Sequence, residues 1–177
     1  VENLPTSGDL TWPGGTWNSG ATSPTAGDEP TSPCQTWRPS ELAGLTGSAG
    51  RVFDLQGPIT GRGQAYVLSF AGDAEVTAAY EQLMTDGAGC ATRLGGRASQ
   101  RQDASAPWGS GEFVDVTLPG PAGDRTVSTG VGRVGTRLVW LAIEVDGTEV
   151  GVLDPQADPD NRHTMINSLP KAMQRLR

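Results

Sequence analysis

The chain has 177 residues, of which 36% are hydrophobic and 19% charged, and its formal net charge at pH 7 is −7. A chain of this length forms one compact domain of ordinary size. Its 13 basic residues stand against 20 acidic ones and form no Lys/Arg cluster, which argues against a nucleic-acid partner and against an anionic membrane surface. No apolar run reaches the ~18 residues of a membrane span, so we expect membrane association only through a removed anchor or signal.

The first 33 residues differ in composition from the rest of the chain. Twenty of them are Ser, Thr, Gly or Pro, which is typical of a flexible tether. Leu10, Trp12 and Trp17 interrupt this composition, and a tryptophan side chain has too much apolar area to be left in water without a reason. We therefore predict a tether over residues 1–33, partly docked, and a single domain over residues 34–177.

Cys34 and Cys90 are the two cysteines of the chain. Neither belongs to a C-x-x-C motif or lies near a histidine, so the sequence contains neither a redox motif nor a zinc site built on them. A disulfide between them is the simplest interpretation, and it indicates an oxidising, extracytoplasmic compartment. The alternative is a pair of unrelated buried thiols in a cytoplasmic protein.

Hydrophobic periodicity and turn residues predict the first half of the domain. The segment 39–45 is predicted to be a short helix, and 51–56 and 64–70 are predicted to be neighbouring strands. An amphipathic helix is expected from Asp73 to a stop at Gly87, because its apolar residues recur at helical spacing. Residues 91–102 are polar and interrupted by glycine, which favours an edge strand.

The second half of the domain contains the stronger strand patterns. Residues 112–118, 126–133 and 136–145 alternate, and the last two form a hairpin. A second amphipathic helix is predicted from Asp158 onward, bent or broken by Pro170. This order predicts an α+β fold with an antiparallel sheet of about five to six strands and helices packed on one face.

Strand alternation defines a candidate ligand-binding surface. We expect one set of apolar residues to face the helices, namely Val114, Val116, Val139, Leu141 and Ile143. Alternation then puts Phe113, Asp115, Trp140 and Glu144 together on the outer face of the sheet, with Trp140 as the anchor for a bound ligand. Aromatic and acidic groups on one surface suit a sugar, a small amphipathic ligand or a protein contact. The alternative is that residues 1–33, which we call the leader, cover this face through Trp12 and Trp17.

Catalytic and metal sites are poorly supported by the residues. His163 lacks a G-x-S-x-G nucleophile motif, and the acidic cluster of Asp154, Asp158, Asp160 and Asn161 lacks the spacing of a calcium loop. The glycines between Gly130 and Gly135 lie in a predicted hairpin, so they do not form a phosphate loop. We therefore expect no catalytic residue, no metal and no cofactor.

The order of several landmarks resembles a known family. These landmarks are a Gly/Pro-rich leader, Cys34-Gln35-Thr36-Trp37, a strand ending in Phe70, a helix with Ala74 and Tyr80, Cys90, the hairpin Gly132-Arg133-Val134-Gly135-Thr136-Arg137 and a closing helix. Over residues 34–177 they resemble the extracellular sensor domain of mycobacterial receptor-type serine/threonine kinases of the PknH type, many members of which stand alone as actinobacterial secreted proteins or lipoproteins. The resemblance implies an extracytoplasmic α+β sensor domain with a ligand cleft and no catalytic activity. It carries over only the bridge role, onto Cys34 and Cys90, because those kinase sensors usually have two disulfides.

The sequence thus favours a non-catalytic binding or sensor module of an actinobacterial cell envelope, secreted or lipid-anchored, whose ligand or protein partner is unknown. The first alternative is a secreted cell-wall or polysaccharide hydrolase that uses a carboxylate pair such as Asp115 and Glu144. The second is an envelope scaffold whose partner is another protein.

Overall fold

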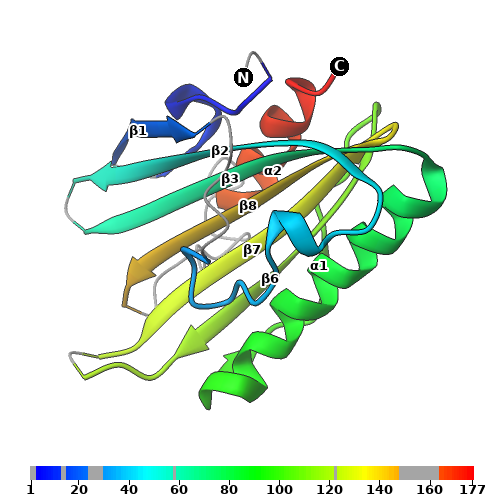
Figure 1. Ribbon diagram of the computed structural model, residues 1–177. Coiled ribbons are helices and arrows are strands. Elements are labelled where there is room, and N and C mark those ends of the chain that lie inside the picture. Colours follow the sequence, from blue (N-terminus) through cyan, green and yellow to red (C-terminus); the bar gives the residue numbers. More distant parts are fainter. Residues whose placement is uncertain (1–2, 13–14, 24–29, 58, 122, 148–163) are drawn as a thin grey trace.

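The computed structural model describes residues 3–12, 15–23, 30–57, 59–121, 123–147 and 164–177. Its strands are β1 (Thr16–Ser23), β2 (Leu45–Gln56), β3 (Gly61–Phe70), β4 (Arg97–Ala98), β5 (Gln102–Asp103), β6 (Ser110–Leu118), β7 (Arg125–Val134) and β8 (Arg137–Asp146). The described residues form one antiparallel sheet of eight strands in the order β1-β2-β3-β8-β7-β6-β4, with β5 paired to β6 (Figure 1). The predicted α+β character is confirmed, but the sheet is larger than the five to six strands expected.

The two long helices lie on opposite faces of this sheet, so the prediction of helices on one face is wrong (Figure 1). The helix α1 (Asp73–Leu94) buries Val76 and Leu83 in one core, and the helix α2 (Thr164–Gln174) buries Met165 and Leu169 in a second core. The sheet is therefore a middle layer between two hydrophobic cores, and we call its two sides the α1 face and the α2 face.

The strand β8 shows why one-sided packing fails. Its side chains alternate between the two cores, and both sets are buried. The α1 face receives Leu138, Trp140 and Ala142, whereas the α2 face receives Val139, Leu141, Ile143 and Val145. A central strand that is apolar on both faces needs a cover on each side, because neither face can be left in water.

The helix α1 runs through Gly87, where we expected it to stop, and ends at Leu94. Gly87 is buried under the sheet-facing side of the helix, and a Cβ there would lie 3.4 Å from Thr129. That distance is an ordinary van der Waals contact, so packing on β7 does not require the glycine, and the glycine does not end the helix. The end comes at Gly95, whose φ of 72° is the left-handed conformation typical of a helix C-cap.

Glycines of β7, in contrast, are required for the close approach of α2 to the other face. A Cβ on Gly132 would lie 2.3 Å from Cγ of Met173, and one on Gly130 would lie 3.0 Å from Sδ of Met165. Both glycines lie inside the strand, so the reading of this segment as a hairpin and not as a phosphate loop agrees with the structure.

The described part of the leader is packed onto the α2 face. Leu4, Leu10 and Trp17 are buried in the core of that face, and β1 adds a strand to the edge of the sheet beside β2. A 3₁₀ helix, η1 (Ser7–Asp9), lies next to α2, and the Arg175 guanidinium contacts the Asp9 carboxylate at 3.0 Å. The division into residues 1–33 and 34–177 stays a prediction.

The remaining elements confirm some predictions and correct others. The neighbouring strands β2 and β3 and the hairpin of β7 and β8 are confirmed. The short helix predicted over 39–45 is only a 3₁₀ turn, η2 (Pro39–Glu41), and the edge strand predicted over 91–102 is the end of α1 followed by the two-residue strands β4 and β5. Helix α2 continues past Pro170 to Gln174, so the proline does not break it, and its predicted start at Asp158 lies outside the described residues.

Candidate functional site

The four residues predicted to share an outer face do not share one. Phe113 of β6 is in register with Gly130 of β7, and Gly130 is in register with Leu141 of β8. Phe113 therefore lies on the same face as Leu141, the α2 face. Trp140 lies on the α1 face, and both aromatic side chains are fully buried. The predicted aromatic surface is therefore wrong, because it assumed that the face opposite Leu141 was solvated.

Trp140 is instead part of an aromatic cluster inside the α1 core. Its ring centroid lies 5.3 Å from that of Trp37 and 5.8 Å from that of Tyr66, and the rings of Trp37 and Tyr66 are 5.4 Å apart. Edge-to-face and tilted contacts at these distances are favourable aromatic packing. The cluster holds the segment that carries Trp37 against the sheet.

The two acidic residues of the predicted surface also separate. Asp115 lies in register with Ser128 and accepts a hydrogen bond from its hydroxyl, and Gln102 donates to Asp115 at 3.2 Å. Asp115 is thus on the α2 face, in line with Ile143, whereas Glu144 lies on the α1 face, where Arg125 donates to it at 2.6 Å. A carboxylate pair made of Asp115 and Glu144 cannot flank one substrate bond, because the sheet separates them.

The disulfide between Cys34 and Cys90 is present, as predicted, with the two Cα atoms 5.0 Å apart. It joins the C-terminal part of α1 to residues 34–42, which we call the strap. Cys34, Trp37 and Leu42 anchor the strap in the α1 core. The bridge and these anchors fix the strap alongside the helix.

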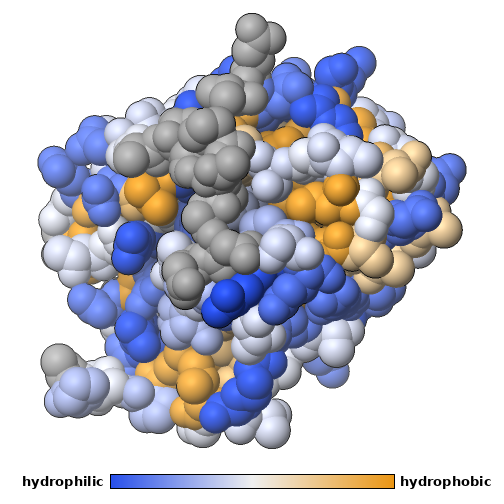
Figure 2. All heavy atoms as spheres, viewed as in Figure 1, coloured by the Kyte–Doolittle hydropathy of each residue, from blue (hydrophilic) through white to orange (hydrophobic). Residues whose placement is uncertain are grey.

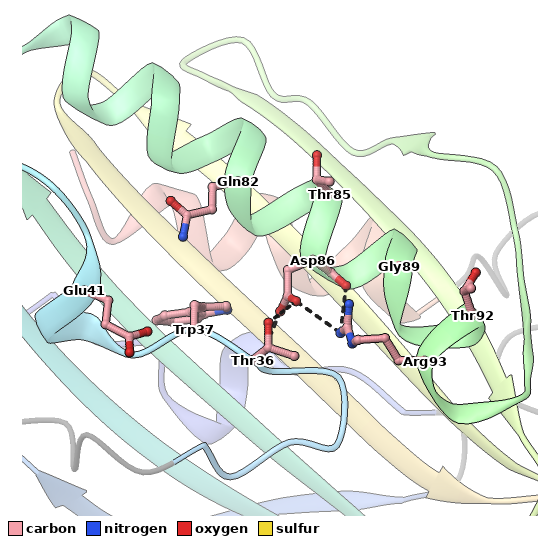
Figure 3. Close-up of a pocket in the computed structure, with 9 residues that line it drawn as sticks. All are labelled: Thr36, Trp37, Glu41, Gln82, Thr85, Asp86, Gly89, Thr92 and Arg93. Carbon is pink, nitrogen blue, oxygen red and sulfur yellow. Dashed lines mark hydrogen bonds and ion pairs between the residues drawn. The ribbon is translucent and has the colours of Figure 1, made fainter.

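A groove of about 620 Å³ runs between the strap and α1 (Figure 3). The strap lines it with Thr36, Trp37 and Glu41, and the helix lines it with Gln82, Thr85, Asp86, Gly89, Thr92 and Arg93. The helix residues recur at spacings of three and four, so they form a stripe along one side of α1. The volume lies within the range of small-molecule sites, roughly 300–1,000 Å³.

Asp86 connects the two walls of the groove. Its carboxylate accepts hydrogen bonds from the Thr36 backbone N–H at 3.0 Å and from the Thr36 hydroxyl (Figure 3). Arg93 lies 3.1 Å from the same carboxylate and also donates to the Cys34 carbonyl at 3.4 Å. The Asp86 side chain is only 10% exposed, so these partners hold it as a structural tie between strap and helix.

The rest of the groove presents neutral hydrogen-bonding groups. Gln82 and Thr92 are exposed along the helix, and the Thr85 hydroxyl accepts from Arg101 at 3.3 Å while remaining at the groove wall. Glu41 and Asp86 carry negative charge against one positive charge on Arg93. The groove thus offers both donors and acceptors on walls that also expose apolar surface, and it is slightly acidic.

The surface around the groove is polar as well. On the side that carries α1, hydrophilic residues surround small, separated hydrophobic patches (Figure 2). Among the described residues, Leu94 is the large hydrophobic side chain that is exposed, at 44%. No cluster of three or more His, Cys, Asp or Glu residues within the described ranges could hold a metal ion. His163 and the acidic cluster from Asp154 to Asn161 lie outside those ranges.

No protein-family model, curated protein or solved structure matches this chain. None of the described helices is long and apolar enough to span a membrane. The geometry of the groove is therefore the main basis for a functional assignment.

Sequence reasoning missed the groove, although it found the disulfide beside it. The stripe from Gln82 to Arg93 has the composition of any solvent-exposed helix side, which is how an amphipathic pattern is normally interpreted. The available signal was the disulfide itself, because a bridge from Cys34 to a helix containing Cys90 puts the following residues beside that helix.

Proposed function

We propose that this protein is a non-catalytic, extracytoplasmic binding or sensor module of a cell envelope, and that its ligand occupies the groove between the strap and α1. The observation that carries the proposal is the groove of about 620 Å³, lined by hydrogen-bonding side chains, whose two walls are tied by the disulfide and by Asp86. Fixed walls favour binding, because less conformational freedom is lost when the ligand arrives.

The disulfide supports the extracytoplasmic part of the proposal. Cys34 and Cys90 are both buried, and the bridge closes a sequence separation of 56 residues. Stable structural disulfides are typical of oxidising compartments and rare in a reducing cytoplasm. The PknH-type resemblance points to the same compartment and to a ligand cleft, and we include membership of that group of actinobacterial envelope proteins in the proposal.

The chemistry of the groove favours a neutral ligand rich in hydroxyl groups, such as a saccharide. Gln82 offers an amide that donates and accepts, and Thr92 offers a hydroxyl that does both. Glu41 at the rim accepts from hydroxyl donors and disfavours anions. Because these groups are polar and spread along the helix, they suit several hydrogen bonds better than burial of one apolar group.

The proposal is tested by titrating the ¹⁵N-labelled protein with a panel of neutral mono- and oligosaccharides. We expect a saturable ligand to shift the backbone amides of the strap and of residues 82–93 of α1. Gln82→Ala should weaken its binding by about tenfold, the value of one or two lost hydrogen bonds. Gln174→Ala, at an exposed position of α2, is the matched control and should bind normally. Saturable shifts confined to other surfaces would contradict the groove as the site.

A further inference from the structure

A second, smaller cavity lies far from the groove, at the end of β2, β3 and β8 where the leader packs. This notch has a volume of about 220 Å³. It is lined by Asn3, Leu4, Gly47, Ser48, Ala49, Val67, Ser69 and Arg137. Gly47, Ser69 and Arg137 are cross-strand neighbours in one row of the ladder, so they lie side by side.

Among the described residues that line the notch, Arg137 is the charged one, and its described partners are neutral. Its Nη1 donates to the Leu176 carbonyl at 3.2 Å. When the Asn3 amide is oriented so that both its oxygen and its nitrogen have hydrogen-bond partners, its oxygen accepts from Nη1 of Arg137 at 3.0 Å and from Nη2 at 2.5 Å. Among the described residues no carboxylate lies within ion-pair distance of this guanidinium, although it is half-buried.

These contacts leave one edge of the guanidinium available. They use three of its five N–H donors, so Nε–H and the second Nη2–H remain without a partner among the described residues. Those two donors form the side edge of the fork, which matches the paired oxygens of a carboxylate or a phosphate. A half-buried positive charge with only carbonyl partners is incompletely compensated, and an anion would compensate it.

The walls of the notch leave room for such a group. A Cβ added to Gly47 would meet nothing within 4 Å, so the space above this residue is open. Ser69, between Gly47 and Arg137, adds a hydroxyl donor at the floor. None of the described residues that line the notch is acidic, in contrast to the net charge of −7 of the whole chain.

We propose that this notch is a second binding site, for an oxyanion that is either a carboxylate or a phosphate group. The anion accepts two hydrogen bonds side-on from Nε and Nη2 of Arg137 and one from the Ser69 hydroxyl, and it occupies the open space above Gly47. The proposal is independent of the groove, because the groove lies on the α1 face and favours neutral ligands, whereas this row of residues lies on the α2 face.

The test is a pair of titrations of the ¹⁵N-labelled full chain at low ionic strength, one with inorganic phosphate and one with acetate. We expect at least one probe to shift the amides of Gly47 and Ser69 and the Arg137 Nε–H signal saturably. Saturation by phosphate alone assigns a phosphate group to the site, and saturation by acetate assigns a carboxylate.

Three variants separate specific binding from general attraction of anions. Arg137→Gln should weaken the saturable binding by about tenfold or more, the value of charge-assisted hydrogen bonds. Because Arg137 also holds the C-terminal segment, Gly47→Val is the second variant: it fills the notch without touching the guanidinium and should abolish the shifts. Arg97→Gln removes the same charge from exposed β4 and should change nothing. No saturable shift with either probe, or equal binding by wild type and Gly47→Val, would overturn the proposal.

Discussion

Trp140 and Leu141 are adjacent in β8, yet their side chains lie in different hydrophobic cores, on the α1 face and the α2 face of the sheet. Both are fully buried. Neighbouring residues of a strand point to opposite sides, so β8 joins two cores that are otherwise separate. The sheet is stable only when α1 with the strap covers one face and α2 with the leader covers the other.

We predict that Trp140→Ala destabilises the protein about as much as Leu141→Ala. Both changes remove a fully buried side chain, and truncations of this kind cost about 2–5 kcal/mol. Trp140→Ala also removes the ring against which Trp37 and Tyr66 pack. Urea unfolding of the two variants measures the loss. A Trp140→Ala protein as stable as wild type would show that the tryptophan is not part of the core.

The same strand explains how far sequence reasoning reached. Alternation correctly gave the hairpin of β7 and β8 and the pairing of β2 with β3. It could not say which alternating set faces solvent, because in β8 neither does. The uninterrupted apolar run from Leu138 to Ile143 is the pattern of a strand buried on both sides, and Trp140 belongs to it.

Composition predicts neither the packing of the leader nor the groove, for two different reasons. A segment rich in Ser, Thr, Gly and Pro has the composition of a tether, yet Leu4, Leu10 and Trp17 of this segment are buried in the core of the α2 face. The polar stripe from Gln82 to Arg93 becomes a groove wall only because the strap runs beside it. Local patterns carry no information about such long-range neighbours, whereas two cysteines in a chain do.

Gly132 is a position where the fold requires the absence of a side chain. An added Cβ would lie 2.3 Å from Cγ of Met173 and 3.2 Å from Cγ1 of Val139, so Gly132→Ala must displace the Met173 side chain or the helix α2 that carries it. We expect a loss of about 1–3 kcal/mol, typical of overpacking in a core. Gly47→Ala is the matched control, because its Cβ meets nothing within 4 Å. Thermal unfolding of both variants measures the difference. Equal melting temperatures would show that Met173 yields without cost.

The contact between Asp9 and Arg175 makes leader docking sensitive to pH. Burial by itself raises the pKa of Asp9, but hydrogen bonds from Arg175 and Thr6 outweigh burial and hold this pKa below its ordinary value of 3.8. A lowered pKa in the folded state stabilises the protein fully above the ordinary pKa, and this stabilisation is lost as the pH falls through the lowered value.

We therefore predict that Asp9→Asn costs about 1 kcal/mol at pH 7, a modest value because the Arg175 side chain is 44% exposed and solvent screens the pair. Urea unfolding of wild type and variant is compared between about pH 2 and pH 7. The difference between the two proteins, which cancels the titration of other carboxylates, should shrink below pH 3.8. A difference that stays constant with pH would mean that the carboxylate charge contributes nothing.

The last prediction concerns the disulfide that fixes the strap. In the double variant Cys34→Ala, Cys90→Ala we expect the free energy of unfolding to fall by about 4 kcal/mol, because a loop closed over a sequence separation of 56 residues constrains the unfolded chain strongly. The sheet and both helices should persist, since Trp37 and Leu42 still anchor the strap in the α1 core. Urea unfolding measures the loss of unfolding free energy, and amide hydrogen exchange measures how firmly the strap is held. The amide of Thr36, which donates to Asp86, should exchange faster than amides of β8 in the same variant. Wild type that is reduced and alkylated after unfolding is the control, and it should show the same loss of stability. A variant that keeps full stability and slow exchange at Thr36 would show that Asp86 and the aromatic cluster hold the groove without the bridge.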